Sequence, residues 1–331
     1  MTIDPILQAV RHAITLCREV QTNSLRSMNK INAELQDSEP VTIADYGSQV
    51  LICRALAEYF PDDGVIAEEG GSQFLELTND KQKAEIINLL TTILDVNITQ
   101  GKIVSWLDQG LDVDSSRKWI IDPIDGTKGF INMRHYAIGV GYTENGETTG
   151  AIIAAPGYGD GVSGNDDYNG AIFYIEDGKP YQVSIGEETD PVEMSVSDRS
   201  ENLRVVQSYE KQHASKSRMS IVREKAGMSD AEVIELDSME KYALVANGDA
   251  DVYLRLPNLS STRPHMVWDH APGVALVLAA GGKATDVNGE PLDFSQGKTL
   301  PNRGMVISNG VVHDRLLEAV QELLDEEASA E

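Results

Sequence analysis

One short segment constrains this chain most, because it joins a buried strand to two carboxylates and a sharp turn. Residues 119–130 read Trp-Ile-Ile-Asp-Pro-Ile-Asp-Gly-Thr-Lys-Gly-Phe. We expect Asp122 and Asp125 at the end of the strand, where the backbone is stiff and side chains can be aimed. Pro123 fixes φ between them and removes an amide hydrogen. Gly126 lets the chain turn with N–H groups pointing outward.

The oxygen atoms of this segment form a candidate cation site. Carboxylates of Asp122 and Asp125 and the carbonyl of Ile124 are hard ligands. Such ligands suit Mg²⁺, which keeps water and substrate phosphate oxygens in its remaining positions. The segment therefore predicts metal ions held against a phosphate.

Further acidic residues lie at the end of another predicted strand and at the start of a predicted helix. Val65-Ile66-Ala67 predicts a short strand that delivers Glu68 and Glu69 into two glycines. Asp269 opens a helix predicted over 270–280, at or near its N-cap position, so a capping role is one interpretation. Beside the other acidic strand ends, a metal ligand is the favoured interpretation. We interpret the adjacent His270 as structural.

Length and composition describe an ordinary globular protein. The 331 residues exceed the size at which single cores stop growing, so we expect two domains, at 1–193 and 194–331. No segment approaches the roughly 20 apolar residues of a membrane span. The first residues lack a basic region followed by an apolar run, and Cys17 and Cys53 lie in apolar helical patterns. A cytoplasmic protein with two free buried thiols is predicted.

The charge balance restricts the partners. A net charge of -26 argues against binding of nucleic acid polymers, whose affinity depends on Lys and Arg. A small anionic ligand is still compatible, because a few lysines and bound cations can reverse the potential inside one cleft.

Periodicity predicts the order of the elements. Residues 21–40 are polar and are interpreted as a loop, 76–116 as an insertion with one helix and no chemistry, and 157–170 as a long hairpin tip. Helices are expected at 3–20, 46–60, 80–95, 212–226, 238–247, 270–280 and 316–324, and strands at 65–67, 119–125, 137–142, 150–155, 171–175, 205–206 and 252–256.

Three segments together resemble the inositol monophosphatase superfamily, which includes fructose-1,6-bisphosphatases and bisphosphate nucleotidases. They are Ile121–Thr127, the upstream Ala-Glu-Glu-Gly at 67–70, and the downstream Trp-Asp-His-Ala at 268–271. The match covers nearly the whole chain in order. The resemblance implies an α+β N-terminal domain with a mainly antiparallel sheet, packed on an α/β C-terminal domain. Together they would form a layered α-β-α-β-α sandwich.

The residues after Thr127 narrow the resemblance. Lys128-Gly129-Phe130 is similar to the 3'(2'),5'-bisphosphate nucleotidases, as are the segments 41–46, 236–242 and 251–256. This implies a Mg²⁺-dependent, lithium-sensitive hydrolase that converts 3'-phosphoadenosine 5'-phosphate to AMP and phosphate in sulfur assimilation. The related sulfate donor, 3'-phosphoadenosine 5'-phosphosulfate, is a further candidate substrate. The alternatives are an inositol polyphosphate 1-phosphatase, an inositol monophosphatase, or a catalytically silent sensor.

The resemblance also implies roles for single residues. Asp45 would orient a metal-activated water and pair with the Thr127 hydroxyl, which accepts a proton from that water. N–H groups of Gly126 and Thr127 would hold the phosphate. Up to three Mg²⁺ ions would be ligated by Glu68, Asp122, the Ile124 carbonyl, Asp125 and Asp269. Because all six catalytic side chains are present, the silent sensor is disfavoured.

Substrate selection is expected in the second domain. Residues matching Ser238, Lys241 and Arg255 approach the adenosine and its 5'-phosphate in the nucleotidase branch. This chain departs from fungal relatives at Tyr209-Glu210, where they carry Ala-His, so a contact from Glu210 or His213 is left open. The family includes both monomers and homodimers, and both states stay open.

Overall fold

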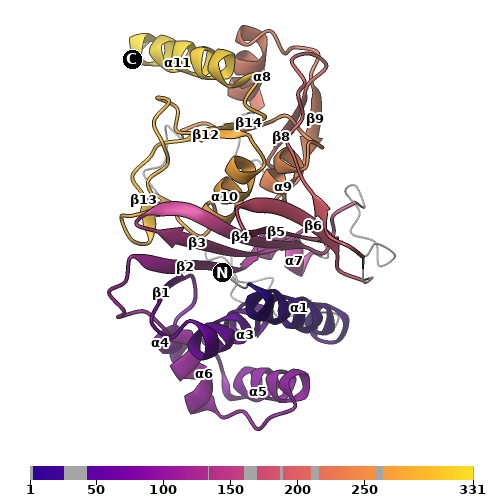
Figure 1. Ribbon diagram of the computed structural model, residues 1–331, viewed down its shortest axis with the longest axis vertical. Helices are drawn as coiled ribbons and strands as arrows, with labels where there is room; N and C mark the ends of the chain where they lie inside the picture. Colours follow the sequence, from indigo (N-terminus) through magenta and orange to yellow (C-terminus); the bar gives the residue numbers. More distant parts are fainter. Residues whose placement is uncertain are drawn as a thin grey trace.

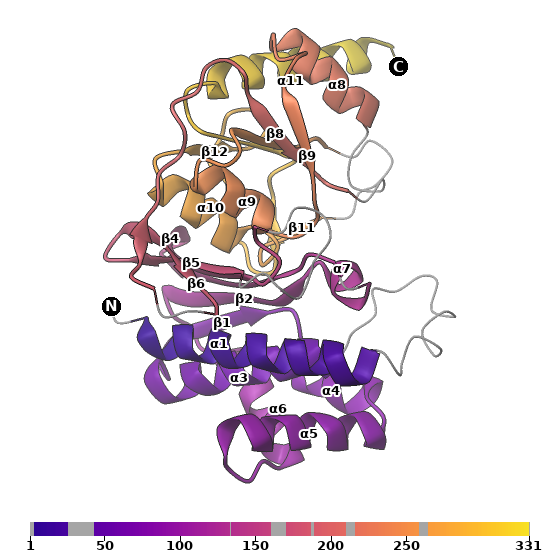
Figure 2. The same ribbon diagram turned by 90° about the vertical axis from the view of Figure 1, so that its right-hand side faces the viewer.

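The computed structural model describes residues 3–25, 43–132, 134–159, 170–186, 189–209, 216–257 and 264–330. Its elements form five layers (Figures 1 and 2). A helical layer made by α1 and α3–α6 covers one face of a seven-stranded sheet, and α9 and α10 cover the other face. A five-stranded sheet follows, with α8 and α11 on its outer side.

The first helical layer is built around α1 and α3. Helix α1 (Asp4–Glu19) has Pro5 in its first turn and buries Ile6, Val10 and Ile14 on one face. Helix α3 (Ile43–Tyr59) is buried on nearly all sides, because α1, α5, α6 and strand β2 surround it. The remaining members are the π-helical turn η1 (Val20–Leu25), α4 (Gly71–Leu77), α5 (Asp80–Leu94) and α6 (Gln100–Leu107).

Two predictions for this layer were wrong. The segment 76–116 holds a second helix, α6, whose N-cap Thr99 accepts a hydrogen bond from the Lys102 amide. Its eight residues are too short for a strong periodic signal. Residues 21–25, predicted as part of a polar loop, belong to the turn η1, which continues α1. The rest of that segment, 26–42, lies outside the described residues.

The seven-stranded sheet brings two acidic strand ends to one edge. Strands β1 (Gly64–Ala67) and β2 (Arg117–Asp125) are parallel, and the register pairs Ala67 with Ile121. Glu68 therefore lies beside Asp122, and its amide donates to the Ile121 carbonyl at 3.3 Å. The other strands pair antiparallel in chain order: β3 (Ala137–Glu144), β4 (Glu147–Ala155), β5 (Ala171–Glu176), β6 (Lys179–Ser184) and β7 (Val192–Glu193).

The five-stranded sheet has the order β12-β14-β10-β8-β9 and mixes parallel and antiparallel pairs. Two short strands, β11 (His265–Met266) and β13 (Thr299–Leu300), pair separately. The elements are β8 (Arg204–Gln207), α8 (Lys216–Lys225), β9 (Glu232–Glu235), α9 (Glu240–Ala246), β10 (Val252–Arg255), α10 (Ala271–Ala279), β12 (Lys283–Thr285), β14 (Met305–Ser308) and α11 (His313–Ala330).

The two sheets share the helices between them. The chain passes from the first sheet to the second between Glu193 and Arg204, close to the domain boundary predicted at 193/194. The division into two domains stays a prediction, because one buried cluster joins Ile120 and Ile153 of the first sheet to Tyr253 of the second. Helices α9 and α10 are thus packed from both sides.

Two glycines on β3 let these central helices approach the first sheet. A Cβ on Gly139 would lie 2.4 Å from the Met239 sulfur, and one on Gly141 would lie 3.2 Å from the Pro272 nitrogen. A side chain at Gly139 would displace the end of Met239, and one at Gly141 would press on the first turn of α10, so glycine at both positions permits the close packing. Close packing places the N-terminal turns of α9 and α10 near the end of β2.

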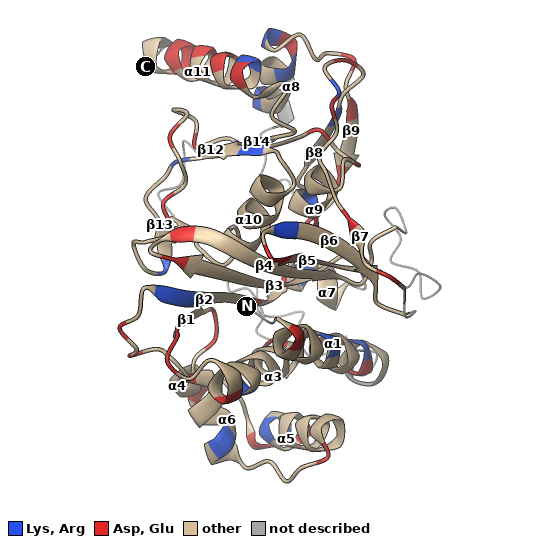
Figure 3. Cartoon of the chain, in the orientation of Figure 1, with Lys and Arg blue, Asp and Glu red and all other residues tan. Residues whose placement is uncertain are grey.

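The acidic residues lie largely on the outside. Figure 3 shows Asp and Glu spread over the outer helix α11 and over several loops. Among the described helices, none combines the length and apolar character that a membrane crossing requires.

Candidate active site

A cleft of about 780 Å³ lies where the ends of β1 and β2 meet the N-terminal turns of α9 and α10. This volume suits a small molecule of nucleotide size. The cleft is lined by all predicted site residues except Asp45, namely Glu68, Asp122, Ile124, Asp125, Gly126, Thr127, Ser238, Lys241, Arg255 and Asp269.

Asp122 is the most strongly perturbed acid of the cleft. Its side chain is 2% exposed, and Oδ1 has no hydrogen-bond partner among the described residues. Burial raises its pKa well above the usual value, and the carboxylates of Glu68, Asp125, Asp269 and Asp45 raise it further. Mutual repulsion of this kind requires these acids to be close, so four of the predicted acids surround the fifth.

Asp125 sits in a different environment. Burial raises its pKa, but Lys241, the Met239 amide and Arg255 act in the opposite direction. Three groups from the second half of the chain therefore favour its charged form. Asp125, at the end of β2, thus interacts with Lys241 of α9 and Arg255 of β10.

The turn after Asp125 has the predicted geometry. Gly126 has φ +89°, which favours glycine, and it forms the N-cap of the short helix α7 (Thr127–Ile131). The first turn of a helix leaves N–H groups without intrahelical acceptors, so an anion can approach here. The Thr127 hydroxyl donates to the Ile124 carbonyl at 3.1 Å. A bond from this hydroxyl to Asp45, as predicted, requires the hydroxyl to turn away from Ile124.

Asp45 lies behind the cleft wall. It stands in the first turn of α3 and is 2% exposed. It acts electrostatically on Asp122, and this places it within range of the acids. Four residues further along the same helix, Gln49 holds the backbone of Glu69: its amide group donates to the Glu69 carbonyl at 2.6 Å and accepts from the Glu69 amide at 2.9 Å. Helix α3 thus carries Asp45 and also fixes the end of β1.

Glu69 faces α3 instead of joining Asp122. Burial raises its pKa to about 7, against opposing effects of a hydrogen bond from Tyr46 and the charge of Lys298. The second glutamate of the pair therefore contributes to the contact between β1 and α3.

Asp269 lies near the N-cap of α10, as predicted, and its alternative interpretation as the capping residue is wrong. The N-cap of α10 is His270, so Asp269 precedes the cap and does not occupy it. His270 is fully buried, and its Nδ1 lies 2.8 Å from the Tyr242 hydroxyl. Burial, and then Arg255, hold the pKa of His270 well below 6.5. A neutral, buried imidazole agrees with its structural interpretation.

The residues expected to select the substrate lie on the opposite wall. Lys241 donates to the Ser238 carbonyl at 2.6 Å, and its ammonium lies 5.6 Å from the Tyr253 ring. Ser238 has φ +70°, an unusual value for serine and a strained one. The pKa of Arg255 is raised, because Tyr253 and Asp269 outweigh the effect of burial.

The fit of a cation can be judged from the donors. A buried carboxylate oxygen without a partner at Asp122, surrounded by four more carboxylates, is the chemistry that a hard cation offsets. As the side chains stand, the described residues contain no group of three or more His, Cys, Asp or Glu that could hold a metal ion. The fit rests on the unpartnered Asp122 oxygen and on the acids that raise its pKa, which suit a hard cation such as Mg²⁺. The ligand roles and the number of ions stay predictions.

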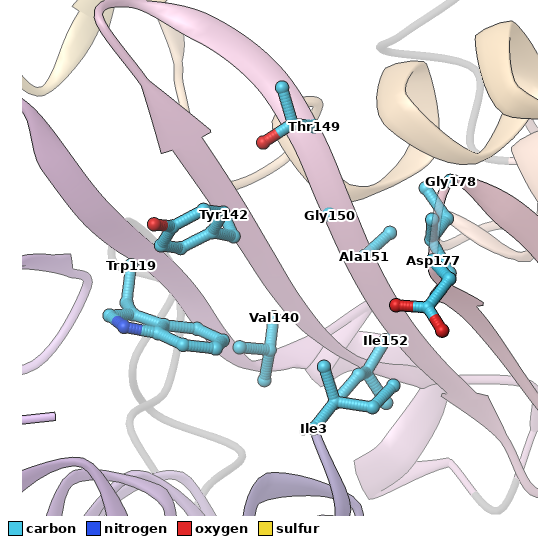
Figure 4. A pocket seen from close by; sticks show the side chains of 11 residues that line it. Ile3, Trp119, Val140, Tyr142, Thr149, Gly150, Ala151, Ile152, Asp177 and Gly178 are labelled. Carbon is cyan, nitrogen blue, oxygen red and sulfur yellow. The ribbon is translucent and has the colours of Figure 1, made fainter. Parts of the chain in front are cut away.

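Several cleft residues were missed by sequence reasoning. Asp237, Tyr242 and Tyr253 lie in segments already noted, whereas Asn302 and Arg303 stand in a loop with no motif. Glu210 and His213 lie outside the described residues. A second cavity, of about 170 Å³, lies among Trp119, Tyr142, Ile3 and Asp177 (Figure 4). Its walls are mostly apolar and include none of the predicted residues.

The cleft thus combines carboxylates at the ends of two parallel strands, a glycine turn at a helix start and cations on the facing wall. The sequence matches the inositol monophosphatase family over residues 3–325. The chain belongs to this family, and it is therefore a phosphatase.

Relatives and solved structures agree with this assignment. The chain is 32% identical to a 3'(2'),5'-bisphosphate nucleotidase of Oryza sativa, over 98% of this chain and 94% of the relative. It is 30% identical to 3'(2'),5'-bisphosphate nucleotidase 1 of Candida albicans, over 95% and 93%. Among solved structures, an IMPase of Thermotoga maritima aligns with a TM-score of 0.61 at 22% identity, over 98% of both chains. CysQ from Bacteroides thetaiotaomicron aligns with 0.62 at 22%, over 92% and 96%. The layered fold predicted from the sequence is confirmed.

Proposed function

We propose that this protein is a Mg²⁺-dependent 3'(2'),5'-bisphosphate nucleotidase that hydrolyses 3'-phosphoadenosine 5'-phosphate to AMP and phosphate. One observation supports this choice most. The acids lie on one wall of the cleft, and Lys241 and Arg255 extend from the other half of the chain. A substrate with two phosphate groups can meet both walls, whereas a monophosphate needs only the acidic wall.

Glu68, Asp122, Asp125, Asp269 and the Ile124 carbonyl would hold the cations. Bound Mg²⁺ would offset the charge of the transferring phosphoryl group and favour ionisation of water. The protein's own groups orient the substrate. The Gly126 and Thr127 amides hold the phosphate oxygens, and Ser238 and Lys241 hold the nucleoside end.

Proton movement falls to Asp45 and Thr127. The Thr127 hydroxyl takes a proton from the attacking water while Asp45 accepts the hydroxyl's own proton. The oxygen that leaves is the 3'-oxygen of the nucleotide, so the products are AMP and inorganic phosphate without a covalent enzyme intermediate. Lithium sensitivity and activity on 3'-phosphoadenosine 5'-phosphosulfate belong to the same proposal.

Release of inorganic phosphate from a panel of esters tests the proposal. The panel holds 3'-phosphoadenosine 5'-phosphate, 5'-AMP, inositol 1-phosphate and inositol 1,4-bisphosphate, each with Mg²⁺ and with EDTA. We expect the adenosine bisphosphate to give the highest kcat/KM, with 5'-AMP as product by chromatography and no turnover in EDTA. Preference for an inositol ester would favour an inositol phosphatase and reject the nucleotidase.

A further inference from the structure

One arginine in the cleft has no partner among the residues that the structure describes. Arg303 lines the cleft together with Lys241 and Arg255 and is exposed. It makes no hydrogen bond or ion pair with any described residue. Lys241 and Arg255, in contrast, both act on Asp125, and Lys241 also donates to the Ser238 carbonyl. In a cleft with many acids, Arg303 is an exposed cation that stays available to a ligand.

The residue before Arg303 is firmly anchored. The Asn302 amide group donates to Asp286 and to the Pro291 carbonyl, each at 3.1 Å, and its Oδ1 accepts from the Asp293 amide at 2.9 Å. An asparagine side chain can make four hydrogen bonds. Three bonds, to three different residues, already fix the orientation of Asn302.

The residue after Arg303 is fixed by close packing. Gly304 has φ +67°, and a Cβ there would lie 2.7 Å from the Arg255 carbonyl oxygen. Met305 then pairs with Arg255 in the β10–β14 register. The backbone on both sides of Arg303 is thus held close to Arg255, so binding a ligand here does not require the loop backbone to be ordered first.

We propose that Arg303 binds the second phosphoryl group of the substrate, the one that is not transferred. This inference rests on the proposed function and deepens it by naming a specificity-determining residue. A guanidinium is permanently charged and can donate two parallel hydrogen bonds to a phosphate, so it suits this position. Arg255 lies deeper and faces Asp269, whereas Arg303 stands at the exposed part of the cleft wall.

Steady-state kinetics on two substrates test the proposal. Adenosine 3'-monophosphate and 3'-phosphoadenosine 5'-phosphate share the reacting group and the base, and differ only in the second phosphate. For Arg303→Gln we expect the ratio of their kcat/KM values to shift against the bisphosphate by roughly ten- to a hundredfold, mainly through KM. Arg303→Lys keeps the charge but loses the paired donors, so the shift is expected to be smaller.

Lys81→Gln serves as the matched control, since it removes one exposed positive charge on α5, outside the cleft. Its ratio is expected to equal that of the wild type. An equal loss for both substrates in Arg303→Gln would indicate a contact to the base and overturn the proposal, as would an unchanged ratio. A wild type without preference for the bisphosphate would instead contradict the proposed function, whatever the variant does.

Discussion

His135 Nδ1 lies 2.9 Å from a carboxylate oxygen of Glu240, and both side chains are buried. Glu240 is the first residue of α9 and follows Ser238 by two positions. The His135 backbone packs on α7, because a Cβ on Gly129 would lie 2.2 Å from the His135 carbonyl oxygen. The pair therefore ties the helix that begins at Thr127 to the turn that carries Ser238 and Lys241.

Removing one partner of this pair is expected to destabilise the protein. In Glu240→Ala the imidazole of His135 loses its buried hydrogen-bond partner, and we expect a loss of about 1–3 kcal/mol in the free energy of unfolding. Urea titration measures it. Glu193→Ala, which breaks the exposed pair with Lys179, is the control and should change stability little. Equal effects in the two variants would contradict a special role of the buried pair.

Asp122→Asn is expected to inactivate the enzyme and yet stabilise its metal-free form. The substitution removes a buried charge that four carboxylates repel. Relief of about 1–3 kcal/mol would raise Tm in EDTA by several degrees for a chain of this size. In Mg²⁺ the order should reverse, because only the wild type gains from cation binding. Thermal unfolding scans of the wild type and the variant, with Mg²⁺ and with EDTA, measure both differences in Tm. A lower Tm of the variant in EDTA would argue against charge repulsion at this position.

Thr127→Ala and Asp45→Asn are each expected to lower kcat by about 10²–10⁴, the range for loss of a positioned proton acceptor. The fold should persist, because with the described residues the Thr127 side chain makes a single hydrogen bond, to Ile124. Thr127→Ser keeps the hydroxyl and should keep most of the activity. Initial rates and circular dichroism of the three variants measure both effects. Near-normal turnover in Thr127→Ala and Asp45→Asn together would refute their part in activating water.

Much of the site could be predicted because strand ends carry local signals. Val65–Ala67 and Trp119–Ile121 are short apolar runs followed directly by acids, so both the strands and their terminal carboxylates are visible in the sequence. That the two strands are parallel neighbours, which sets Glu68 beside Asp122, depends on pairing across fifty residues. Before the structure, the family resemblance implied that Glu68 and Asp122 share a site, but it did not give the parallel pairing.

Other features depend on tertiary contacts without a local signal. Gln49 looks like an ordinary helical residue, and its two bonds to the Glu69 backbone arise because α3 packs against the end of β1. Arg303 stands in no motif and gains its place from the anchoring of Asn302 and Gly304. Which acceptor the Thr127 hydroxyl donates to, the Ile124 carbonyl or the Asp45 carboxylate, likewise depends on side-chain rotation that sequence does not encode.

Acidification is expected to destabilise the protein partly through His313, the first residue of α11. Its Nδ1 lies 2.9 Å from the Ser308 hydroxyl and its Nε2 lies 3.0 Å from that of Thr285. Burial, and then the charge of Lys283, lower its pKa below 6.5. The folded state thus prefers the neutral ring, and the unfolded chain takes up the proton first as the pH falls.

Stability from this residue is therefore fully present above about pH 6.5 and decreases below it, by at most about 1.4 kcal/mol per pH unit. Urea titrations of the wild type and of His313→Gln between pH 7.5 and 5 measure the difference. Because the pKa values of His12 and His270 are also lowered, the variant should keep part of the acid-induced loss. The slope for His313→Gln should be shallower than that of the wild type over this range. Parallel slopes would mean that His313 takes up its proton equally well in the folded and unfolded states, and would contradict the effect of its burial.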